Sequence, residues 1–317
     1  MKVYYLGPKG TFSEEAALYF ARQLDIPESD IVQVETIAQV IERVYQEGRE
    51  NTNSTALGCV PLENSIQGSV TMAWDTLGRI CREEQSKAPM LENVWQVGLS
   101  PTIVASVTLS IEHFLLTLPG TDVTAIEEIL SHPQGLAQCT DWLRENLPSA
   151  RQTAVSSTAD AARIVAGEGN SHKAAIGPQA AGRLYQLNRS LKSIQNSSIN
   201  QTRFGLIALN SSKPDVMKWF PRKHWTLSIV LTGVANAPGG LYQSLHPFHK
   251  QGFNLTRIES RPSGSQLGEY LFYLDVEWPY GNQRPEETAA WIEVREELAE
   301  SSIQVVRLGW FPELVRQ

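Results

Sequence analysis

The feature that most constrains the fold is a unit that recurs through residues 1–210. Each copy consists of a short apolar run rich in β-forming residues, a turn of small polar residues, and a segment with helical periodicity. The first copy has Lys2–Leu6 as the apolar run, Gly7–Gly10 as the turn and a helix that extends to Arg22. Strands that alternate with helices in this way favour a largely parallel sheet covered by helices. We therefore predict an α/β fold for this region.

Four further copies place polar side chains directly after an apolar run. Helix N-termini that follow strand ends carry unpaired N–H groups, so this edge of the sheet can bind a small anion. Two helices open with a capping box, Thr11 to Glu14 and Ser157 to Asp160. The further copies are Ala56–Leu62 with Glu63-Asn64-Ser65 and a helix around Met72–Leu77, Ile126–Leu130 with Ser131-His132-Pro133-Gln134 and a helix to Asn146, Ala154-Val155 with Ser156-Ser157-Thr158 and a helix to Ala166, and Ala174–Ile176 with Gly177-Pro178 and a helix to Leu187.

The last third of the chain follows a different pattern. Residues 211–223, rich in Lys, Pro and Ser, interrupt both periodicities and are predicted to be a linker. The order βαββαβ after it is that of a ferredoxin-like α+β domain, so we expect 224–317 to form an independent small domain. Its predicted elements are a strand at Trp225–Val234, a helix at Gly239–Gln251, strands at Asn254–Ser260 and Glu269–Trp278, a helix at Pro285–Glu300 and a strand at Ile303–Leu308.

Charge and composition exclude several kinds of partner. The chain has 27 basic and 34 acidic residues, a net charge of −7, and so lacks the basic field that nucleic acid or an anionic membrane surface requires. Its most apolar stretch, Val94–Leu118, is interrupted by polar residues, and its start does not look like a signal peptide. We expect a cytoplasmic protein. Three cysteines without a CxxC pair predict free buried thiols, and no metal site or cofactor motif is recognised.

Two polar clusters near the N-terminal units have both a structural and a functional interpretation. The Gly7–Glu14 turn lacks the spacing of a nucleotide-binding loop, which leaves an ordinary capped turn or an anion pocket. The stretch from Pro61 to Gly68 places carboxyl, amide and hydroxyl groups just past a strand. Asn, Ser and Gly favour turns in any case, but a carboxylate such as that of Glu63 is well placed there for acid-base work.

Two later clusters are equally open. His132 is either a helix cap or a titratable group of a site. Thr202-Arg203-Phe204 begins an apolar strand after a polar loop. An Arg beside a hydroxyl would suit a carboxylate ligand that must also receive a proton.

Together these segments resemble the prephenate dehydratase family over nearly the whole chain. Any one motif would be weak, but five in this order are specific. The motifs that carry the resemblance are Leu6-Gly-Pro-Lys-Gly-Thr-Phe-Ser-Glu14, Val60-Pro-Leu-Glu-Asn-Ser65, Ser131-His-Pro-Gln134, Ser157-Thr158 and Asn200-Gln-Thr-Arg-Phe204. The tail is similar to the ACT regulatory domain of that family through Pro238-Gly-Gly-Leu241, Asn254-Leu-Thr-Arg-Ile-Glu-Ser-Arg-Pro262 and Leu308-Gly309.

The resemblance implies that prephenate loses water and carbon dioxide to give phenylpyruvate, on the way to phenylalanine, without a cofactor. It implies a catalytic part of two α/β lobes, as in periplasmic binding proteins, with the site between them. We expect lobe 1 at about 1–105 and 188–210 and lobe 2 at about 106–187. The ACT part is expected to bind L-phenylalanine at a subunit interface and to favour a less active, closed state, in a homodimer or homotetramer.

The family also implies roles for single residues. The Thr of the Thr-Arg-Phe motif is regarded as essential there, and here it is Thr202. Threonine is a weak acid, so we expect it to be a positioned donor to the departing hydroxyl, backed by Glu63 or a water. Arg203 and the helix N-termini after Gly10 and Ser157 are expected to hold the carboxylates. The substrate contacts carried over from the motifs are Thr11, Ser13, Asn64, Ser65, His132, Gln134, Ser157, Thr158 and Phe204.

The ACT resemblance assigns a phenylalanine site. The family more often has Ala at the position of Gly240. The positions carried over are Gly240, Leu241, Asn254, Leu255, Thr256, Glu259, Ser260, Arg261 and Pro262.

Two alternative functions remain open from the sequence. An arogenate dehydratase would act on a substrate that differs only by an amino group in place of the side-chain keto group, and the motifs do not separate the two. A non-catalytic amino-acid-sensing protein is the second alternative, because two-lobed α/β clefts also serve receptors. The intact Glu63, Thr202 and Arg203 argue against it.

Overall fold

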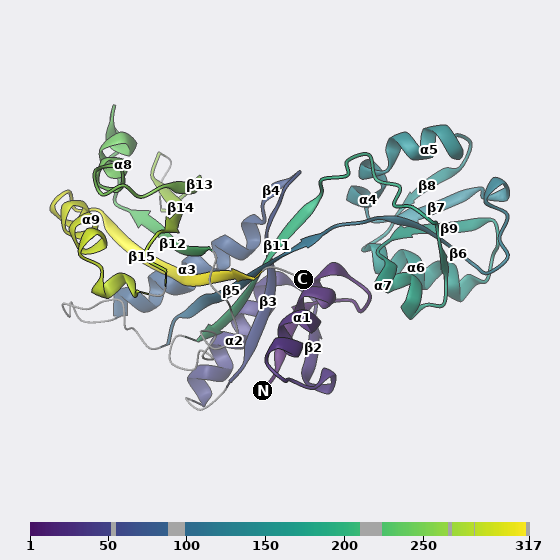
Figure 1. The fold of residues 1–317 in the computed structure, drawn as a ribbon, viewed down its shortest axis with the longest axis horizontal. Coiled ribbons are helices and arrows are strands. Elements are labelled where there is room, and N and C mark those ends of the chain that lie inside the picture. The colour runs from purple at the N-terminus through teal and green to yellow at the C-terminus, as the bar shows by residue number, and fades with distance from the viewer. Residues whose placement is uncertain (52–54, 88–98, 210–223, 266–267, 282, 315–317) are drawn as a thin grey trace.

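The arrangement of the chain is elongated. The computed structural model describes residues 1–51, 55–87, 99–209, 224–265, 268–281 and 283–314. In Figure 1 the purple N-terminal part lies in the middle, with a teal lobe at one end and the green and yellow C-terminal part at the other. Long strands pass through the middle and connect the three parts.

The N-terminal part forms one end of a large sheet. It consists of β1 Val3–Leu6, α1 Phe12–Gln23, β2 Ile31–Val34, α2 Ile37–Glu50, β3 Leu57–Asn64, β4 Gly68–Ser69 and α3 Thr71–Lys87. The strands β3, β1 and β2 are parallel neighbours, as predicted. Alternate residues of β3 pack into two cores: Leu57 and Cys59 with α1, Val60 and Leu62 with α2 and α3. A strand buried on both faces in this way is typical of a parallel sheet.

Two antiparallel strands extend this sheet and lead to the second lobe. They are β5, Pro101–Ser110, and β11, Gln201–Leu209. Strand β11 lies between β3 and β5 and is antiparallel to both. The chain leaves for the second lobe after β5 and returns just before β11, so both crossings meet at the ends of these two strands (Figure 1).

The second lobe has a sheet of its own in the order β10-β6-β9-β7-β8. Its strands are β6 Phe114–Thr117, β7 Glu128–Ser131, β8 Arg151–Ala154, β9 Lys173–Gly177 and β10 Asn188–Arg189, and its helices are α4 Pro133–Gln138, α5 Thr140–Asn146, α6 Thr158–Glu168 and α7 Gln179–Leu184. The single helix expected up to Asn146 is two helices, which meet at Cys139. The core of this lobe is built from small residues of α6, such as Ala161 and Ala162, packed on the sheet.

The second lobe begins and ends later in the chain than the predicted bounds of 106 and 187. Residues 106–110 belong to β5 in the large sheet, and Asn188–Arg189 still pairs with β6 in the second sheet. Strand β5 continues because Ser106, Thr108 and Ser110 alternate with apolar residues and no turn residue interrupts them. The second lobe therefore begins at about residue 114 and ends at about 189.

The C-terminal part has the predicted βαββαβ order. Its elements are β12 Trp225–Thr232, α8 Gly240–Lys250, β13 Leu255–Pro262, β14 Tyr270–Trp278, α9 Ala289–Glu300 and β15 Gln304–Leu314. The strands lie in the order β13-β14-β12-β15 and are antiparallel to their neighbours, which is the ferredoxin-like arrangement. The predicted linker, 211–223, lies outside the described residues.

The C-terminal part is not independent, contrary to the prediction. Strand β15 continues past Leu308 and pairs in parallel with β5, so one sheet runs through both parts. Gly309 looked like the end of the strand, but it is the point of closest approach, because a Cβ there would lie 2.5 Å from the carbonyl oxygen of Ile103. The apolar cores also merge: Phe311 and Tyr273 pack with Trp74 of α3 in one cluster.

The described residues contain no helix that is both long enough and apolar enough to span a membrane. Cys59, Cys81 and Cys139 are buried and free, as predicted. Burial raises the pKa of the Cys81 and Cys139 thiols to about 12, so neither is a reactive thiolate at neutral pH.

Candidate functional site

A cavity of about 910 Å³ lies where the two lobes meet. Lobe 1 contributes the first turn of α1 and the ends of β3 and β11, and lobe 2 contributes the starts of α4 and α6. Nine of the predicted site residues line this cavity. They are Thr11, Ser13, Asn64, His132, Gln134, Ser157, Thr158, Thr202 and Phe204.

The N-termini of two helices from different lobes border this cavity. Thr11 caps α1 by accepting from the Glu14 N–H, and Ser157 caps α6 by accepting from the Asp160 N–H. Both caps follow from the sequence, because Thr and Ser satisfy one N–H and hold the first turn in place. The N–H groups that precede the first intrahelical bonds remain available to an anion.

No Lys or Arg is found among the described residues that line the cavity. The positive potential that a negatively charged ligand needs would therefore come from oriented N–H groups and hydroxyls, such as those at the helix ends.

His132 also belongs to the residues that line the cavity. Its Nδ1 accepts from the Gln134 N–H at 3.3 Å, so His132 caps α4 and is at the same time a cavity residue.

The hydroxyl of Thr202 is held at the cavity by a neighbouring amide. Thr202 and Asn64 stand opposite each other in the β11–β3 pair, and Asn64 Nδ2 donates to Thr202 Oγ1 at 2.9 Å. The orientation of this amide is fixed, because Asn64 Oδ1 accepts from the N–H groups of Ile66 and Gln67. Since the oxygen of Thr202 already accepts a hydrogen bond, its own proton is free to be donated to a ligand.

Three residues without an assigned role extend this network into the second lobe. Asn64 also donates to Asn200 Oδ1 at 2.9 Å, and Asn200 Nδ2 donates to Gln138 Oε1 at 3.0 Å. His113 Nε2 lies 3.0 Å from the same oxygen, and because that oxygen can only accept, Nε2 carries a proton. Burial lowers the pKa of His113, so its ring is neutral at pH 7. The network thus contains groups from both lobes and from the first crossing.

The sequence contains weak indications for two of these residues and none for Gln138. Asn200 stands at the edge of the Thr-Arg-Phe motif, and His113 is a polar residue inside an apolar run. Gln138 had no signal, since a Gln near the end of a helix is usually exposed. Their meeting point depends on the two crossings, which bring residues 62 positions apart within hydrogen-bond distance.

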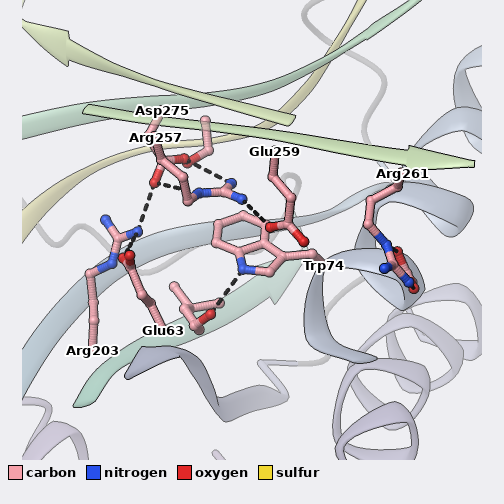
Figure 2. A network of polar contacts seen from close by, with 10 residues as sticks. Glu63, Trp74, Arg203, Arg257, Glu259, Arg261 and Asp275 are labelled. Carbon is pink, nitrogen blue, oxygen red and sulfur yellow. Dashed lines mark hydrogen bonds and ion pairs between the residues drawn. The ribbon is translucent and has the colours of Figure 1, made fainter. Parts of the chain in front are cut away.

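Arg203 and Glu63 do not line the cavity, which corrects their predicted roles at the substrate. Successive side chains of a strand point to opposite faces, so Arg203 points away from the face that carries Thr202. Its Nη2 donates to Glu63 at 3.1 Å and to Asp275 of β14 at 2.7 Å (Figure 2). Ser65 is also outside the lining, and its hydroxyl accepts from the Gln201 N–H, which ties the ends of β3 and β11 together.

The predicted phenylalanine positions lie on the start of α8 and along β13. Gly240 is required there, because a Cβ would lie 2.1 Å from the carbonyl oxygen of Ala235, which accounts for the absence of Ala. Glu259 and Arg261 face α3, where Arg261 forms two hydrogen bonds with Asp75. Of the other positions, Leu241 and Ser260 are exposed, and Pro262 ends the strand. Asn254 donates to Glu277, and Thr256 donates to the Asp275 carbonyl. Leu255 packs on the core of the C-terminal part.

Comparisons with known proteins agree with this geometry. The sequence model of the prephenate dehydratase family matches residues 3–212. The bifunctional chorismate mutase/prephenate dehydratase of Pseudomonas aeruginosa is 34% identical over 316 residues, which cover 99% of this chain and 74% of that protein. The prephenate dehydratase of Methanocaldococcus jannaschii is 36% identical over 275 residues, 87% of this chain and 88% of that protein.

A solved structure has the same fold. The crystal structure of prephenate dehydratase from Arthrobacter aurescens, in complex with L-Phe, superposes with a TM-score of 0.73. The match covers 98% of this chain and 90% of that chain at 26% identity. The similarity thus extends over both lobes and the C-terminal part.

Proposed function

The chain belongs to the prephenate dehydratase family, and we propose that its cavity binds prephenate and converts it to phenylpyruvate. In this reaction prephenate takes up one proton and yields phenylpyruvate, carbon dioxide and water. The observation that carries the proposal is the Thr202 hydroxyl, which lines the cavity with its oxygen already bonded to Asn64 and its proton free. Formation of an aromatic ring drives the reaction, so binding and one well-placed donor are the main requirements.

Binding of the substrate dianion is supported by the helix ends. The N-termini of α1 and α6 approach the cavity from different lobes, and each can take one carboxylate. The capping hydroxyls of Thr11 and Ser157 lie beside these N–H groups. A substrate that bridges the two helix ends would stabilise the lobes in a fixed relative position.

The chemical step requires the ring hydroxyl to leave as the carboxylate on the opposite ring carbon is lost. The electron pair of the breaking carbon–carbon bond enters the ring, and the carbon–oxygen bond breaks. A hydrogen bond from Thr202 to the departing oxygen stabilises the negative charge that develops there, until a proton completes the water molecule. The Asn64 amide keeps the threonine oxygen in place throughout.

Glu63 and Arg203 are given a different role from the one the motifs suggested. Their side chains form an ion pair on the face of β3 and β11 that is turned away from the cavity. Glu63 therefore does not back Thr202 directly. Asn64, Asn200 and Gln138 are the groups that hold the hydroxyl.

For the C-terminal part we propose the function of an ACT regulatory domain that binds L-phenylalanine. Its ferredoxin-like topology and the segments 238–241 and 254–262 support this assignment. We also propose a homodimer or homotetramer in the cytoplasm, with lyase activity that phenylalanine inhibits. Gel filtration with light scattering, with and without phenylalanine, measures the assembly.

The proposed reaction is tested with two variants of one residue. Thr202→Val keeps the shape of the side chain but removes the hydroxyl, whereas Thr202→Ser keeps the hydroxyl. We expect Thr202→Val to lower kcat by about a hundredfold or more, and Thr202→Ser to retain at least a tenth of the activity. Phenylpyruvate formation from prephenate at neutral pH is the measurement, with arogenate as the competing substrate.

Three outcomes would contradict the proposal. Thr202→Val with near-normal turnover would remove Thr202 from the chemistry. A wild-type protein that consumes arogenate but not prephenate would be an arogenate dehydratase, and one that consumes neither but binds phenylalanine would be a sensor.

A further inference from the structure

Arg203 is a buried cation next to Thr202 that serves neither the cavity nor a surface. Its side chain is 16% exposed, and that of its partner Asp275 is 0% exposed. The pair joins β11 of the catalytic part to β14 of the C-terminal part (Figure 2). Burial of two charges costs free energy unless good geometry and further hydrogen bonds compensate for it. A buried pair is therefore weak evidence for added stability and suggests another role.

Asp275 is the centre of this network. It accepts from Arg203, from Arg257 Nε and Nη2 at 3.1 Å each, and from the Ser228 hydroxyl. Burial alone would raise its pKa, but the charges of Arg257 and Arg203 lower it to about 2. The carboxylate is therefore charged at every physiological pH, and both guanidinium groups depend on it.

The network continues to the strand that carries the predicted phenylalanine positions. Arg257 of β13 lies over the ring of Trp74, 3.7 Å from its centroid, and donates to Glu259. On the same face of β13, Arg261 pairs with Asp75 of α3. Arg257 thus links β13 to Asp275 within one set of packed charged groups.

The strand at Arg203 is irregular at this point. Arg203 stands opposite Glu63, but Phe204 stands opposite Pro61, so Leu62 is an extra residue and the pair has a bulge. Bulges bend a strand and redirect its side chains. Thr202 lies one residue beyond the bulge, and on the other side of β11 the residues from Gln201 to Leu206 pair with β5 in regular register. Because Thr202 and Arg203 are adjacent in one strand, a contact that holds Arg203 also restrains the backbone next to Thr202.

We infer that the Arg203–Asp275 ion pair positions Thr202, and that phenylalanine lowers turnover by altering this contact. This inference rests on the proposed function, since it names the route from the C-terminal part to the same catalytic hydroxyl. Arg203 is a positioning residue, because it does not touch the cavity. By linkage, a contact that changes with the effector must also change the affinity for it.

The test is a double-mutant cycle of Arg203→Met and Asp275→Asn in the full chain. Each single variant should lower kcat about tenfold and leave KM for prephenate within about twofold, because the helix ends that bind substrate are untouched. The double variant should be no slower than Asp275→Asn, since that substitution already removes the Arg203–Asp275 contact together with the hydrogen bonds from Arg257. Inhibition by phenylalanine should weaken at least about fivefold in all three. Additive losses in kcat, or unchanged inhibition, would overturn the inference.

Folding of these variants is checked by circular dichroism and gel filtration. Arg203→Lys serves as the conservative variant, because it keeps the charge and can still reach Asp275. It should recover most of the activity that Arg203→Met loses. Equal losses in the Lys and Met variants would mean that the charge is irrelevant, which contradicts the inference.

A second measurement does not depend on activity. In protein labelled with ¹³C at threonine methyl groups, the Thr202 signal is assigned by its absence in Thr202→Ser. Phenylalanine should shift this signal in the wild type and shift it less than half as far in Asp275→Asn. An equal shift in both would overturn the inference. If the wild type does not convert prephenate, the proposed function fails, while this signal still decides whether the contact transmits a change.

Asp75→Asn is the matched control. It breaks another ion pair between α3 and the same face of β13, with Arg261, and among the described residues the Asp75 carboxylate forms no hydrogen bond or ion pair with β11. We expect kcat within about twofold of the wild type and an unchanged Thr202 methyl signal in the absence of phenylalanine. A loss as large as that of Asp275→Asn would show that any damage at this interface slows the enzyme, and would overturn the specific role of Arg203.

Discussion

At the scale of single residues, neighbours in one motif have separate tasks. Thr202 and Arg203 are adjacent, yet one lines the cavity and the other pairs with Asp275 of a different part of the chain. The alternation of a β-strand produces this division, so a three-residue motif can serve two places at once. The same holds across the ladder, where Asn64 faces the cavity and Glu63 does not.

The residue scale also gives a prediction for Gln138. Gln138→Met keeps the length of the side chain but removes the oxygen that accepts from Asn200 and His113. Because the Asn200 amide then lacks its partner, the Asn64–Thr202 pair is less well held, and we expect kcat to fall about tenfold with a smaller change in KM. Steady-state kinetics with prephenate measures this.

The control for that prediction is Gln152→Met, an exposed residue of β8 in the same lobe. It should leave kcat unchanged. If both variants slow the enzyme alike, the effect comes from the lobe as a whole and not from the network.

At the scale of elements, Glu128 joins three strands of the second lobe. It starts β7 and accepts from Thr153 of β8 at 2.6 Å, and it forms ion pairs with Arg151 of β8 and Lys173 of β9. The hydrogen bond from Thr153, together with these two cations, lowers the pKa of Glu128 to about 2. Strand β7, which lies between β9 and β8, is therefore fixed to both of its neighbours at one residue.

This arrangement predicts a pH-dependent stability. A carboxyl whose pKa is lower in the folded state stabilises the protein above its ordinary pKa of 4.5, and this stabilisation is lost as the pH falls toward about 2. Glu128→Gln should lower the free energy of unfolding by about 2 kcal/mol at pH 7 and by much less near pH 2.5. Urea denaturation followed by circular dichroism at the two pH values checks it.

Glu127→Gln is the matched control, because its side chain is 80% exposed. It should change the free energy of unfolding by no more than about 0.5 kcal/mol at either pH. A constant difference between Glu128→Gln and the wild type at both pH values would refute the role of the charge.

Helices could be predicted from the sequence where the residues that start them are neighbours in the chain. The caps at Thr11 and Ser157 and the helices that follow them depend on four consecutive residues, and both helices begin where the sequence placed them. The direction of Arg203 was not predictable, because it depends on a bulge at Leu62 of β3 and on a carboxylate 72 positions away. Likewise, Asn64 and Thr202 could be proposed as site residues from their motifs, but Gln138 and His113 come together only through the two crossings.

At the scale of the whole molecule, the large sheet unites parts that the sequence separates. Strand β15 is the last strand of the chain, and it pairs with β5 near the middle of the sheet. The merged core around Trp74, Tyr273 and Phe311 supports the same junction from one face. Lobe 1 and the C-terminal part therefore form one body, whereas lobe 2 has its own sheet and is joined to lobe 1 by the two crossings and by contacts such as that of Gly10 with Ala181 of α7.

A substitution at Gly309 tests the junction between β15 and β5. In Gly309→Val the side chain would meet the Ile103 carbonyl oxygen, since even a Cβ would lie 2.5 Å from it, so β15 and β5 must separate. We expect the free energy of unfolding to fall by about 2–3 kcal/mol and the response to phenylalanine to weaken. Gly167→Ala, on a helix with open space around the position, should not lower stability and should raise it slightly, because Ala favours a helix more than Gly does. Equal stability of the two variants would argue against a tight junction.

The position of β5 between β11 and β15 has a further consequence for solubility. This ten-residue strand is buried along nearly its whole length, with β11 on one side and β15 on the other. Without β15 it would become a long apolar edge strand, which is a template for pairing with another copy and for aggregation. The C-terminal part therefore acts as a cover for its own catalytic part as well as a candidate sensor. A shortened protein without the C-terminal part would need another segment to cover the exposed edge of β5.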